Sequence, residues 1–551
     1  MVVGGGLAGL SAALEAQKSC EVALLSKVHP IRSHSGAAQG GINAALGKND
    51  SWEAHAFDTV KGSDYLADQD SVDILCKEAP GRIADLDRFG TLFSRTPEGD
   101  IAQRPFGGAG FPRTCYAADR TGHHLLHTMY QQCLRNGLRV LEEWFVLKLV
   151  VSEKAMLGLV AYHIPTGEVV PFKSRVVILA TGGYGRIYSK STNAIINTGD
   201  GAALAVDAGA QLMDMEFVQF HPTTLRGTNI LISEAARGEG GYLKNKHGER
   251  FMSRYAKDAM ELAPRDIVAR SIQTEIDQGR GFDNDYIQLD LTHLGRDRIK
   301  SRLPGIRQIS MDFAGVDPIA EPIPIQPGQH YSMGGIEVDN QCKAAVDGLL
   351  SAGESACVSV HGANRLGGNS LLETLVFGKV AGETARAHPH TGIHDEKRLE
   401  TTAKIESERI EDIKGGSKQE PMAALRTEMK DTMTACFGVF RQGDRMAAGL
   451  TTIRDIRKRY MHSRVGDHGK EFNQAIVNHK ELGNMLTAAE AVAMEALARE
   501  ESRGSHSRMD FPNRDDSKFL RHSIVSMFGD TLRLSYKPVR LGRYPVKERV
   551  Y

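Results

Sequence analysis

The 551-residue sequence has no excess of charge of either sign and no long apolar run. Its 68 basic and 68 acidic side chains cancel, which argues against a dedicated nucleic-acid-binding protein, because such proteins carry a basic excess. No apolar run approaches the roughly 18 residues that a membrane-spanning helix needs, and no charged start followed by an apolar stretch marks an export signal. We therefore expect a soluble, intracellular chain without a membrane span of its own.

Cysteine is also scarce. The seven cysteines are scattered, odd in number and without any Cys-x-x-Cys spacing, which fits reduced thiols better than a disulfide framework. The same spacing predicts no zinc site, no iron–sulfur cluster and no other metal site within this chain.

Glycine, in contrast, is abundant, with 57 residues that gather in clusters such as 4–9, 36–41, 182–185 and 362–368. Loops that bring the backbone close to a ligand use glycine in this way. Short β-rich runs at 21–25 and 175–180 alternate with helical stretches, which indicates an α/β sheet. Between about 400 and 500 the spacing becomes helical and predicts a separate helical domain whose apolar stripe is packing core: Leu482, Leu486, Ala489, Ala493 and Ala496. The last segment, 531–551, carries six basic residues and one acid and is expected to be solvated or to face a partner.

The first glycine cluster fits the dinucleotide fingerprint G-x-G-x-x-G between a strand and a helix at 10–17, where the helix start and the bare backbone receive a pyrophosphate. Ser26 and Lys27 stand where an NAD site would place an acid. A second apolar strand runs into Thr-Gly-Gly at 181–183, where flavoprotein chains return to the dinucleotide. Together these two stretches favour FAD over NAD.

Residues 32–42 read Arg-Ser-His-Ser-Gly-Ala-Ala-Gln-Gly-Gly-Ile. Further distinctive blocks lie at 58–64, 118–123, 219–223, 237–241, 265–266, 330–331, 361–370 and 501–504. With these blocks the sequence resembles, in family order from residue 1 to about 520, the flavoprotein subunits of succinate dehydrogenase and fumarate reductase, the complex II family.

The resemblance implies that FAD is bound covalently, through its 8α carbon, to the imidazole of His34. Such a bond raises the reduction potential of the flavin. The flavin potential then comes closer to that of a substrate whose C–C single bond is oxidised to a C=C bond. Considered alone, Asp200 and Glu354 would be turn-capping carboxylates, but the family pattern makes them FAD contacts. The full set of implied contacts is Gly4, Gly5, Gly6, Leu7, Ala8, Gly9, Ser26, Lys27, Ser33, Gln39, Gly40, Gly41, Asp200, Glu354, Ser370 and Leu371.

A four-carbon dicarboxylate needs donors at both ends, with arginine favoured for its bidentate fork. The residues that match the family's substrate ligands are His221, Ser233, His330 and Arg365. Many relatives have threonine where this chain has Ser233, so the hydroxyl donor is kept.

Arg265 aligns with the family residue that takes the substrate proton. Because an arginine with its usual pKa above about 12 is a poor resting base, the resemblance implies a relay that Glu234 and Arg237 continue. In the implied reaction one methylene carbon of succinate gives a hydride to flavin N5 while Arg265 accepts a proton from the other carbon. This is the chemistry of a quinone-linked succinate dehydrogenase of EC type 1.3.5.1, and fumarate reduction runs the same steps backwards.

The expected fold is an α/β, Rossmann-like FAD-binding domain interrupted by an α+β capping domain, followed by a helical domain and a short C-terminal domain. The boundaries that we predict are 1–216 and 334–392 for the two parts of the FAD-binding domain, 217–333 for the capping domain, 393–503 for the helical domain and 504–551 for the C-terminal domain. Closure of the cap over the FAD would exclude water from the hydride path.

The family pattern also implies partners, because this chain lacks the ligands that would carry electrons away from a flavin. We expect an iron–sulfur subunit and membrane anchor subunits that bind a quinone and in some cases haem, with this chain peripheral on the cytoplasmic side of the inner (cytoplasmic) membrane. Alternatives are a fumarate reductase working in the reverse direction, an L-aspartate oxidase, a soluble single-chain fumarate reductase and a non-catalytic flavin scaffold. Covalent flavin and inactivity toward aspartate would exclude the oxidase.

Overall fold

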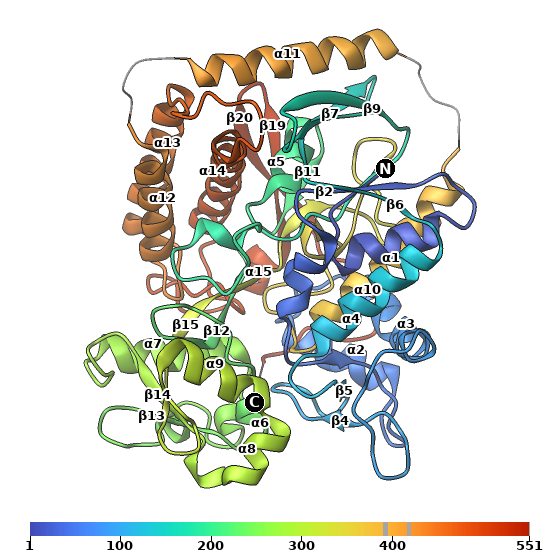
Figure 1. The fold of residues 1–551 in the computed structure, drawn as a ribbon. Helices are drawn as coiled ribbons and strands as arrows, with labels where there is room; N and C mark the ends of the chain where they lie inside the picture. Colours follow the sequence, from blue (N-terminus) through green and yellow to red (C-terminus); the bar gives the residue numbers. More distant parts are fainter. Residues whose placement is uncertain (390–394, 416–419, 550–551) are drawn as a thin grey trace.

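A five-stranded parallel sheet forms the centre of the upper part of the molecule in the computed structural model, which describes residues 1–389, 395–415 and 420–549 (Figure 1). In spatial order its strands are β17 (Leu349–Ser351), β10 (Val177–Leu179), β1 (Val2–Val3), β2 (Ala23–Ser26) and β6 (Arg139–Glu142). β1 pairs with both β2 and β10, so three distant parts of the chain meet in one sheet. The predicted α/β sheet is thereby confirmed.

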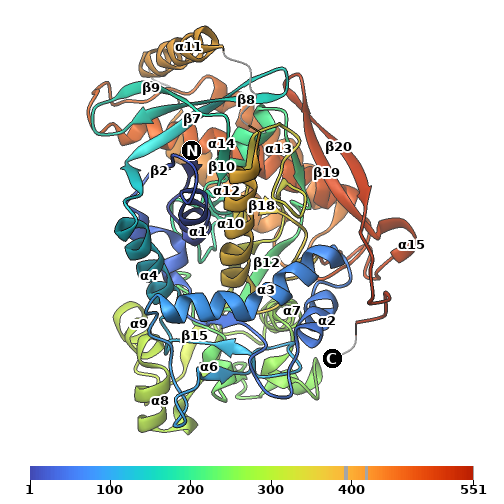
Figure 2. The same cartoon turned by 90° about the vertical axis from the view of Figure 1, so that its right-hand side faces the viewer.

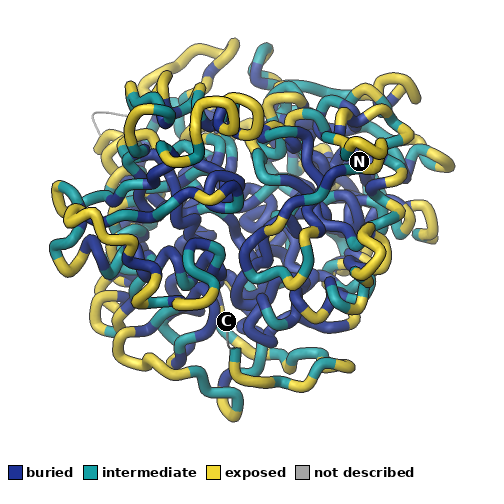
Figure 3. Tube along the Cα trace, turned by 90° about the horizontal axis from the view of Figure 1, so that it is seen from below, coloured by how far each residue is buried: buried dark blue, intermediate teal, exposed yellow. Residues whose placement is uncertain are grey.

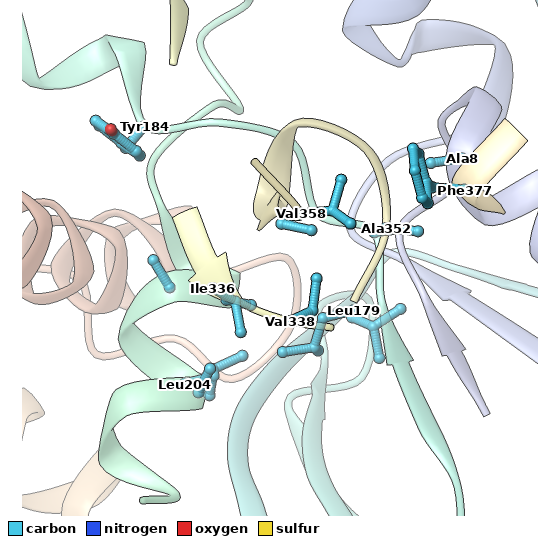
Figure 4. Close-up of a cluster of buried hydrophobic side chains, with 14 of the residues drawn as sticks. Ala8, Leu179, Tyr184, Leu204, Ile336, Val338, Ala352, Val358 and Phe377 are labelled. Carbon is cyan, nitrogen blue, oxygen red and sulfur yellow. The ribbon is translucent and has the colours of Figure 1, made fainter. Parts of the chain in front are cut away.

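Helix α1 (Leu7–Ala16) follows β1 and packs against α10 (Asn369–Ala387) and α4 (Thr121–Arg135). It starts three residues before the predicted helix. The close packing depends on glycine: a Cβ at Gly378 would lie 2.7 Å from the Ala8 carbonyl oxygen, and one at Gly382 would lie 2.6 Å from that of Ala12. Figure 4 shows Ala8 beside Phe377 of α10 within the largest buried apolar cluster.

A three-stranded antiparallel sheet, β7 (Trp144–Ser152), β8 (Ala155–His163) and β9 (Glu168–Lys173), lies beside the parallel sheet. It carries α11 (Glu396–Lys414) on its outer side, at the top of Figure 1. The helical spacing after residue 400 predicts α11, and this helix has two neighbours. Leu399 and Ala403 pack on Val150, Leu157 and Val160 of this sheet. Nearer its end, Ile410 packs with Val465 and Ile476 of the helical region.

The remaining helices of that region form a bundle: α12 (Met422–Cys436), α13 (Gly443–Met461) and α14 (Gln474–Ala498). Helix α14 also packs on α5 (Asp200–Asp207). The prediction of a buried stripe is confirmed, because Leu482, Leu486, Ala489, Ala493 and Ala496 have no exposed surface. The predicted boundary at 392–393 falls outside the described residues.

The C-terminal strands complete a sheet that the FAD-binding part begins. Its order is β18 (Ala356–Cys357), β16 (Gly335–Glu337), β11 (Gln211–Met213), β19 (Arg521–Phe528) and β20 (Thr531–Pro538). The sequence predicts that the segment 531–551 is solvated or faces a partner, and nearly all of its described residues are exposed or half-buried. Its cations also pair with carboxylates of this chain: Lys537, Arg540, Arg543 and Arg549. Residues 550–551 lie outside the described residues.

The lower lobe in Figure 1 is built on a four-stranded antiparallel sheet with a hydrophobic core of its own. The strands are, in order, β12 (Val218–Leu225), β15 (Ile323–Ser332), β14 (Ile287–Asp290) and β13 (Tyr242–Lys244). Four helices accompany it: α6 (Ala235–Gly238), α7 (Arg265–Asp277), α8 (Arg296–Arg302) and α9 (Pro304–Ala314). Since both β12 and the end of β15 adjoin the upper lobe, this lobe is an insertion with two neighbouring connections.

The other elements complete the upper lobe and its connections. Two helices, α2 (Trp52–Gly62) and α3 (Gln69–Arg88), lie on its right-hand side in Figure 1, and α15 (Asp516–Phe519) precedes β19. A small sheet has the order β3 (Ile42–Asn43), β5 (Thr114–Cys115) and β4 (Gln103–Arg104). Short 3₁₀ helices are η1 (Pro30–Arg32), η2 (His34–Ala37), η3 (Gly185–Ile187), η4 (Phe251–Arg254), η5 (Met260–Leu262), η6 (Thr292–Leu294) and η7 (Gly353–Ser355).

Seen from below in Figure 3, buried chain runs through the middle of the molecule and exposed segments lie at its edge. Within the described ranges, none of the helices combines the length and the apolarity that crossing a membrane requires.

Candidate active site

One cavity of about 730 Å³ lies between the parallel sheet and the lower lobe. Its walls contain every residue that the sequence predicts for the site except Gly9 and Arg237. A volume of this size is within the range of small-molecule and cofactor sites. The structure therefore brings together residues that are up to 367 positions apart, from Gly4 to Leu371.

The glycines of the first turn have three different roles. Gly4 has φ +114°, and a Cβ there would lie 2.2 Å from the Ala180 carbonyl oxygen. Gly9 packs α1 onto this turn, since its Cβ would lie 1.9 Å from the carbonyl oxygen of Gly4. Gly6 lines the cavity, and its Cβ would meet only Ser33 and Ser35, at 3.4 Å or more. The missing side chain of Gly6 thus leaves open space where a dinucleotide fingerprint places the pyrophosphate.

Lys27 and Asp200 form an ion pair at the same end of the cavity. The Lys27 ammonium is 2.6 Å from Asp200 and 2.8 Å from Glu481 of α14. Burial alone would lower the pKa of Lys27, but Asp200 and Glu481 outweigh it and raise that pKa. Asp200 is the first residue of α5 and also accepts a hydrogen bond from Asn484. The bundle therefore supports the polar wall of this part of the cavity.

His34 starts η2 and lines the cavity. The backbone N–H of Ala194 donates to its Nδ1 at 3.2 Å, and the Asn193 amide nitrogen is 3.3 Å from its Nε2. Burial, together with the positive charge of Arg186, lowers the pKa of His34 to about 4. The imidazole is therefore neutral at pH 7.

Glu354 and Gln39 both line the cavity. Glu354 accepts a hydrogen bond from the Ser332 N–H at 3.0 Å, and burial raises its pKa to about 7. Gln39 connects the two lobes, since it donates to the Leu231 carbonyl oxygen at 2.9 Å and accepts from the Ser233 N–H at 3.2 Å. The other predicted cofactor contacts line the same walls: Gly5, Leu7, Ala8, Ser26, Ser33, Gly40, Gly41, Ser370 and Leu371.

Two neutral histidines face each other where β12 meets β15. The His221 and His330 ring centroids are 4.9 Å apart. Nδ1 of His221 accepts from the Thr223 N–H at 3.2 Å, so its Nε2 carries the proton and can donate into the cavity. Burial, and then nearby Arg265, holds the pKa of both imidazoles well below the usual value. Both rings are therefore neutral, and the Nε2 of His221 supplies a neutral donor.

Arg365 brings a positive charge to this group. It is buried at 2% exposure, and within the described parts of the chain no carboxylate forms an ion pair with it. Its Nε is buried without a hydrogen-bond partner. The guanidinium stacks over Tyr331 at 4.5 Å, and burial followed by repulsion from Arg265 lowers its pKa to about 9. An unpaired buried cation of this kind fits an anionic ligand.

Arg265 lies at the start of α7 and is held by two residues of the lower lobe. Its Nε donates to Glu234 at 2.8 Å, and its Nη1 donates to the amide oxygen of Gln219 at 3.2 Å. Burial would raise the pKa of Glu234, but Arg265 and Arg237 lower it on balance. Arg237, outside the cavity wall, is 3.8 Å from Glu234. The three predicted relay residues therefore lie in one row, with a hydrogen bond from Arg265 to Glu234 and only an ion-pair contact between Glu234 and Arg237.

Ser233 stands beside this row and is 2% exposed. Its hydroxyl oxygen accepts from the N–H of Ala235, the first residue of α6, at 3.2 Å. The hydroxyl proton is thereby left for a ligand in the cavity.

Residues that sequence reasoning did not assign complete the site. Gln219 bonds both Arg265 and Arg365, Asn193 and Ala194 hold His34, and Tyr331 lies under Arg365. Gln219 and Tyr331 belong to the blocks 219–223 and 330–331, which also contain the predicted ligands His221 and His330. Membership of these blocks could have indicated that both residues belong to the site. For Asn193 and Ala194 the sequence offered no such indication.

Comparison with protein families gives two matches. Residues 1–371 match the FAD binding domain family, and residues 426–551 match the family described as fumarate reductase flavoprotein C-term. The first covers the cavity walls from Gly4 to Leu371, and the second includes most of the bundle and the strands β19 and β20.

Relatives match over nearly the whole chain. The fumarate reductase flavoprotein subunit of Mycobacterium tuberculosis (strain ATCC 25618 / H37Rv) is 43% identical, over 100% of this chain and 98% of that protein. The succinate dehydrogenase flavoprotein subunit of Rickettsia bellii is 45% identical, over 98% of this chain and 95% of that protein. Among solved structures, a variant of the E. coli quinol fumarate reductase chain FrdA superposes with a TM-score of 0.97 at 40% identity, covering 100% of this chain and 98% of that one.

Proposed function

The chain belongs to the family of succinate dehydrogenase and fumarate reductase flavoprotein subunits, and we propose that it interconverts succinate and fumarate within a respiratory succinate:quinone oxidoreductase. The observation that supports this function is a single cavity. It is lined by the bare glycine turn and His34 at one end, and by two neutral histidines and two arginines at the other.

The donors at the substrate end fit a dianion. Arg365 offers charge without a carboxylate partner, while His221 and Ser233 offer neutral donors beside the neutral ring of His330. Neutral imidazoles avoid the repulsion that four neighbouring cations would cause. Pairing with a carboxylate is worth about 1.5–3 kcal/mol for each charged hydrogen bond, so two carboxylates would hold the substrate at both ends.

The proton moves through this chain's own side chains. We assign Arg265 as the residue that exchanges a proton with a methylene carbon, and Glu234 and Arg237 as the groups that continue the relay. FAD, when bound, supplies the hydride acceptor. The contact from Arg265 Nε to Glu234 supports this assignment, because a proton that arrives at the guanidinium can be matched by one that leaves toward the carboxylate.

We also propose that His34 carries the FAD in an 8α-histidyl bond through Nε2. The Ala194 N–H donates to Nδ1, which leaves Nε2 as the nitrogen that would hold the flavin. A neutral imidazole is required for such a bond to form, and the lowered pKa of His34 supplies it.

Electrons leave the chain through partner subunits in this proposal. We infer an iron–sulfur subunit and quinone-binding membrane subunits, with haem in some assemblies, and a peripheral place on the cytoplasmic side of the membrane. The division at residues 216, 333, 392 and 503 remains our proposal for the domain limits. Relatives carry the name of either direction of the reaction, so succinate oxidation and quinol-driven fumarate reduction are the two candidate physiological directions.

Anaerobic addition of succinate to the purified holoprotein tests the function. We expect the flavin absorbance to bleach with succinate and to be unchanged by L-aspartate; bleaching by aspartate alone would instead favour an oxidase. Arg265→Lys should keep its flavin and bind dicarboxylates but lose most turnover. After denaturation the flavin should stay with the wild-type polypeptide and separate from His34→Ala.

A further inference from the structure

The segment 539–549, here called the C-terminal strap, runs from β20 along α2 and α3 toward the lower lobe (Figure 2). It is fixed by reciprocal bonds between Gln69 and Tyr544: the Gln69 amide nitrogen donates to the Tyr544 carbonyl oxygen at 2.7 Å, and the Tyr544 N–H donates to the Gln69 amide oxygen at 2.9 Å. The Arg540 N–H also donates to Asp68 at 2.6 Å. The strap is therefore bound firmly to the upper lobe along most of its length.

At the far end of the strap, Arg549 joins the two lobes. Its side chain is 8% exposed and its guanidinium pairs with Asp266 of α7, in the lower lobe. On the upper-lobe side, Nη1 donates to the Gly62 carbonyl oxygen at 3.3 Å, and Nε is 4.0 Å from the Asp64 carboxylate. One arginine thus connects a carboxylate from each lobe.

Asp266, the lower-lobe partner of Arg549, lies next to the proposed proton acceptor Arg265. Asp266 directly follows Arg265 and is the second residue of α7. Its carboxylate is buried, and besides Arg549 it accepts from Arg270 at 3.1 Å. Arg270 also donates to the Gly504 carbonyl oxygen at 2.7 Å. The first turn of α7 is therefore held from outside the lower lobe by Arg549 and by the segment around Gly504.

We propose that Arg549 is a positioning residue for the reaction: it fixes the first turn of α7 against the upper lobe and so sets the place of the Arg265 guanidinium between Glu234 and Gln219. This inference rests on the proposed function of Arg265. Proton exchange depends on placement, and a displacement of about 1 Å can cost roughly a hundredfold in rate. Substrate binding depends on Arg365, His221 and His330, which lie on other elements, so a loosened α7 should slow the chemistry more than it weakens binding.

The test compares Arg549→Gln, which removes the charge, with Arg549→Lys, which keeps it but lacks the planar fork. Lys547→Gln is the matched control, because Lys547 is an exposed cation of the same strap. For each holoprotein, stopped-flow absorbance follows flavin reduction by saturating succinate, and a malonate titration measures dicarboxylate affinity.

For Arg549→Gln we expect the full amplitude of flavin reduction with a rate at least tenfold lower, and malonate affinity within twofold of wild type. Arg549→Lys should regain part of the rate, and Lys547→Gln should match wild type. A wild-type rate with reduced amplitude would show that Arg549 serves folding alone, and a rate within twofold of wild type would overturn the proposal.

Hydrogen exchange provides a second readout that does not depend on turnover. The amides of residues 265–270 should exchange several-fold faster in Arg549→Gln than in wild type or Lys547→Gln. Unchanged exchange at these residues would refute the positioning role, whatever the activity of the protein. If succinate failed to reduce the wild-type flavin, the proposed function would fail instead. If Arg549→Gln does not accumulate, Arg549→Lys carries both comparisons.

Discussion

The amide oxygen of Gln219 accepts hydrogen bonds from both Arg265 and Arg365, at 3.2 Å and 2.9 Å. Its amide nitrogen donates to the Asn364 amide oxygen and to the Arg365 carbonyl oxygen. Both ends of the Gln219 amide are thus hydrogen-bonded, which fixes its orientation. The proposed proton acceptor and the proposed substrate-binding cation are therefore placed by a single uncharged side chain. A neutral bridge adds no negative charge beside Arg365, whose own charge has no carboxylate partner among the described residues and so stays available to a dianion.

Replacing Gln219 by methionine should lower turnover at least tenfold. The substitution keeps the side-chain length but removes two hydrogen bonds to charged groups, each worth about 1.5–3 kcal/mol, and 1.4 kcal/mol corresponds to a factor of ten. Succinate oxidation per mole of bound flavin measures the loss. Gln308→Met is the control, because Gln308 also lines the cavity but is exposed and bonds only Asp312 among the described residues. Equal rates for the two variants would contradict this role of Gln219.

Arg365→Met should weaken malonate binding by ten- to a hundredfold. Arg365 is buried and has no carboxylate partner among the described residues, so its charge is free to pair with the ligand at about 1.5–3 kcal/mol for each bond. Perturbation of the flavin spectrum by malonate gives the dissociation constant. Arg120→Met removes a charge from the exposed rim of the same cavity, where screening limits the effect to about 1 kcal/mol or less. The proposal for Arg365 fails if the rim variant loses as much affinity.

Stability should fall as the pH rises through about 9, because of His522. This buried imidazole lies 2.7 Å from Asp214 and 3.2 Å from Asp68. Burial alone would lower its pKa, but the two carboxylates raise it from 6.5 to about 9. As the pH rises, His522 therefore loses its proton at a lower pH in the unfolded state than in the folded state. Its contribution to stability is complete below pH 6.5 and disappears above pH 9.

The contribution of protonated His522 to the free energy of unfolding is on the order of 3 kcal/mol. Comparison of wild type with His522→Gln separates this contribution from those of other titrating groups. Urea unfolding midpoints at pH 6 and pH 9.5 provide the measurement. We expect a large difference between wild type and variant at pH 6 and a much smaller one at pH 9.5. The same gap at both pH values would rule out the protonated form as its source.

Asp119 should hold the lower lobe closed over the cavity. Its carboxylate, on the upper lobe, accepts from the Gly305 and Ile306 N–H groups of the first turn of α9 at 2.6 Å and 3.0 Å. Capping of this kind is worth about 0.5–2 kcal/mol. A Cβ at Gly305 would lie 2.9 Å from either carboxylate oxygen, so Gly305→Ala should disturb the contact as Asp119→Asn does.

Limited trypsin digestion and thermal unfolding measure this contact. Both variants should be cleaved faster within 217–333 and should melt at a lower temperature. Asp312→Asn, the same substitution at an exposed site on α9, should resemble wild type within about 0.5 kcal/mol. Cleavage that is equally slow in all three variants would show that Asp119 is not needed for closure.

Local sequence predicted those parts of the molecule that depend on local conformation. The turn at Gly4 requires a positive φ, and the spacing to Gly9 is set by one turn of helix, so both features can be identified from the residues themselves. The stripe on α14 is buried as its period requires. The dicarboxylate ligands, in contrast, were found through the family resemblance, since no spacing rule relates His221 to Arg365.

The parts that sequence did not predict depend on long-range packing. The period of α11 indicates a helix, but it does not say whether that helix covers a bundle or a sheet. Likewise, nothing near Arg549 in the sequence indicates that Asp266, 283 residues earlier, is its partner. The ion pairs of the basic tail could not be predicted either, because its acidic partners, Asp68, Asp73 and Asp266, lie far away along the chain.

The order of the central sheet has a consequence for synthesis on the ribosome. β1 is made first, but its neighbour β10 ends at residue 179, and β17, the edge strand beyond it, ends at residue 351. The cavity wall is complete only with Ser370 and Leu371, and β11 receives its partner β19 only after residue 528. The nascent chain therefore carries an incomplete parallel sheet until residue 351 has been made, and the cavity wall cannot be complete before residue 371.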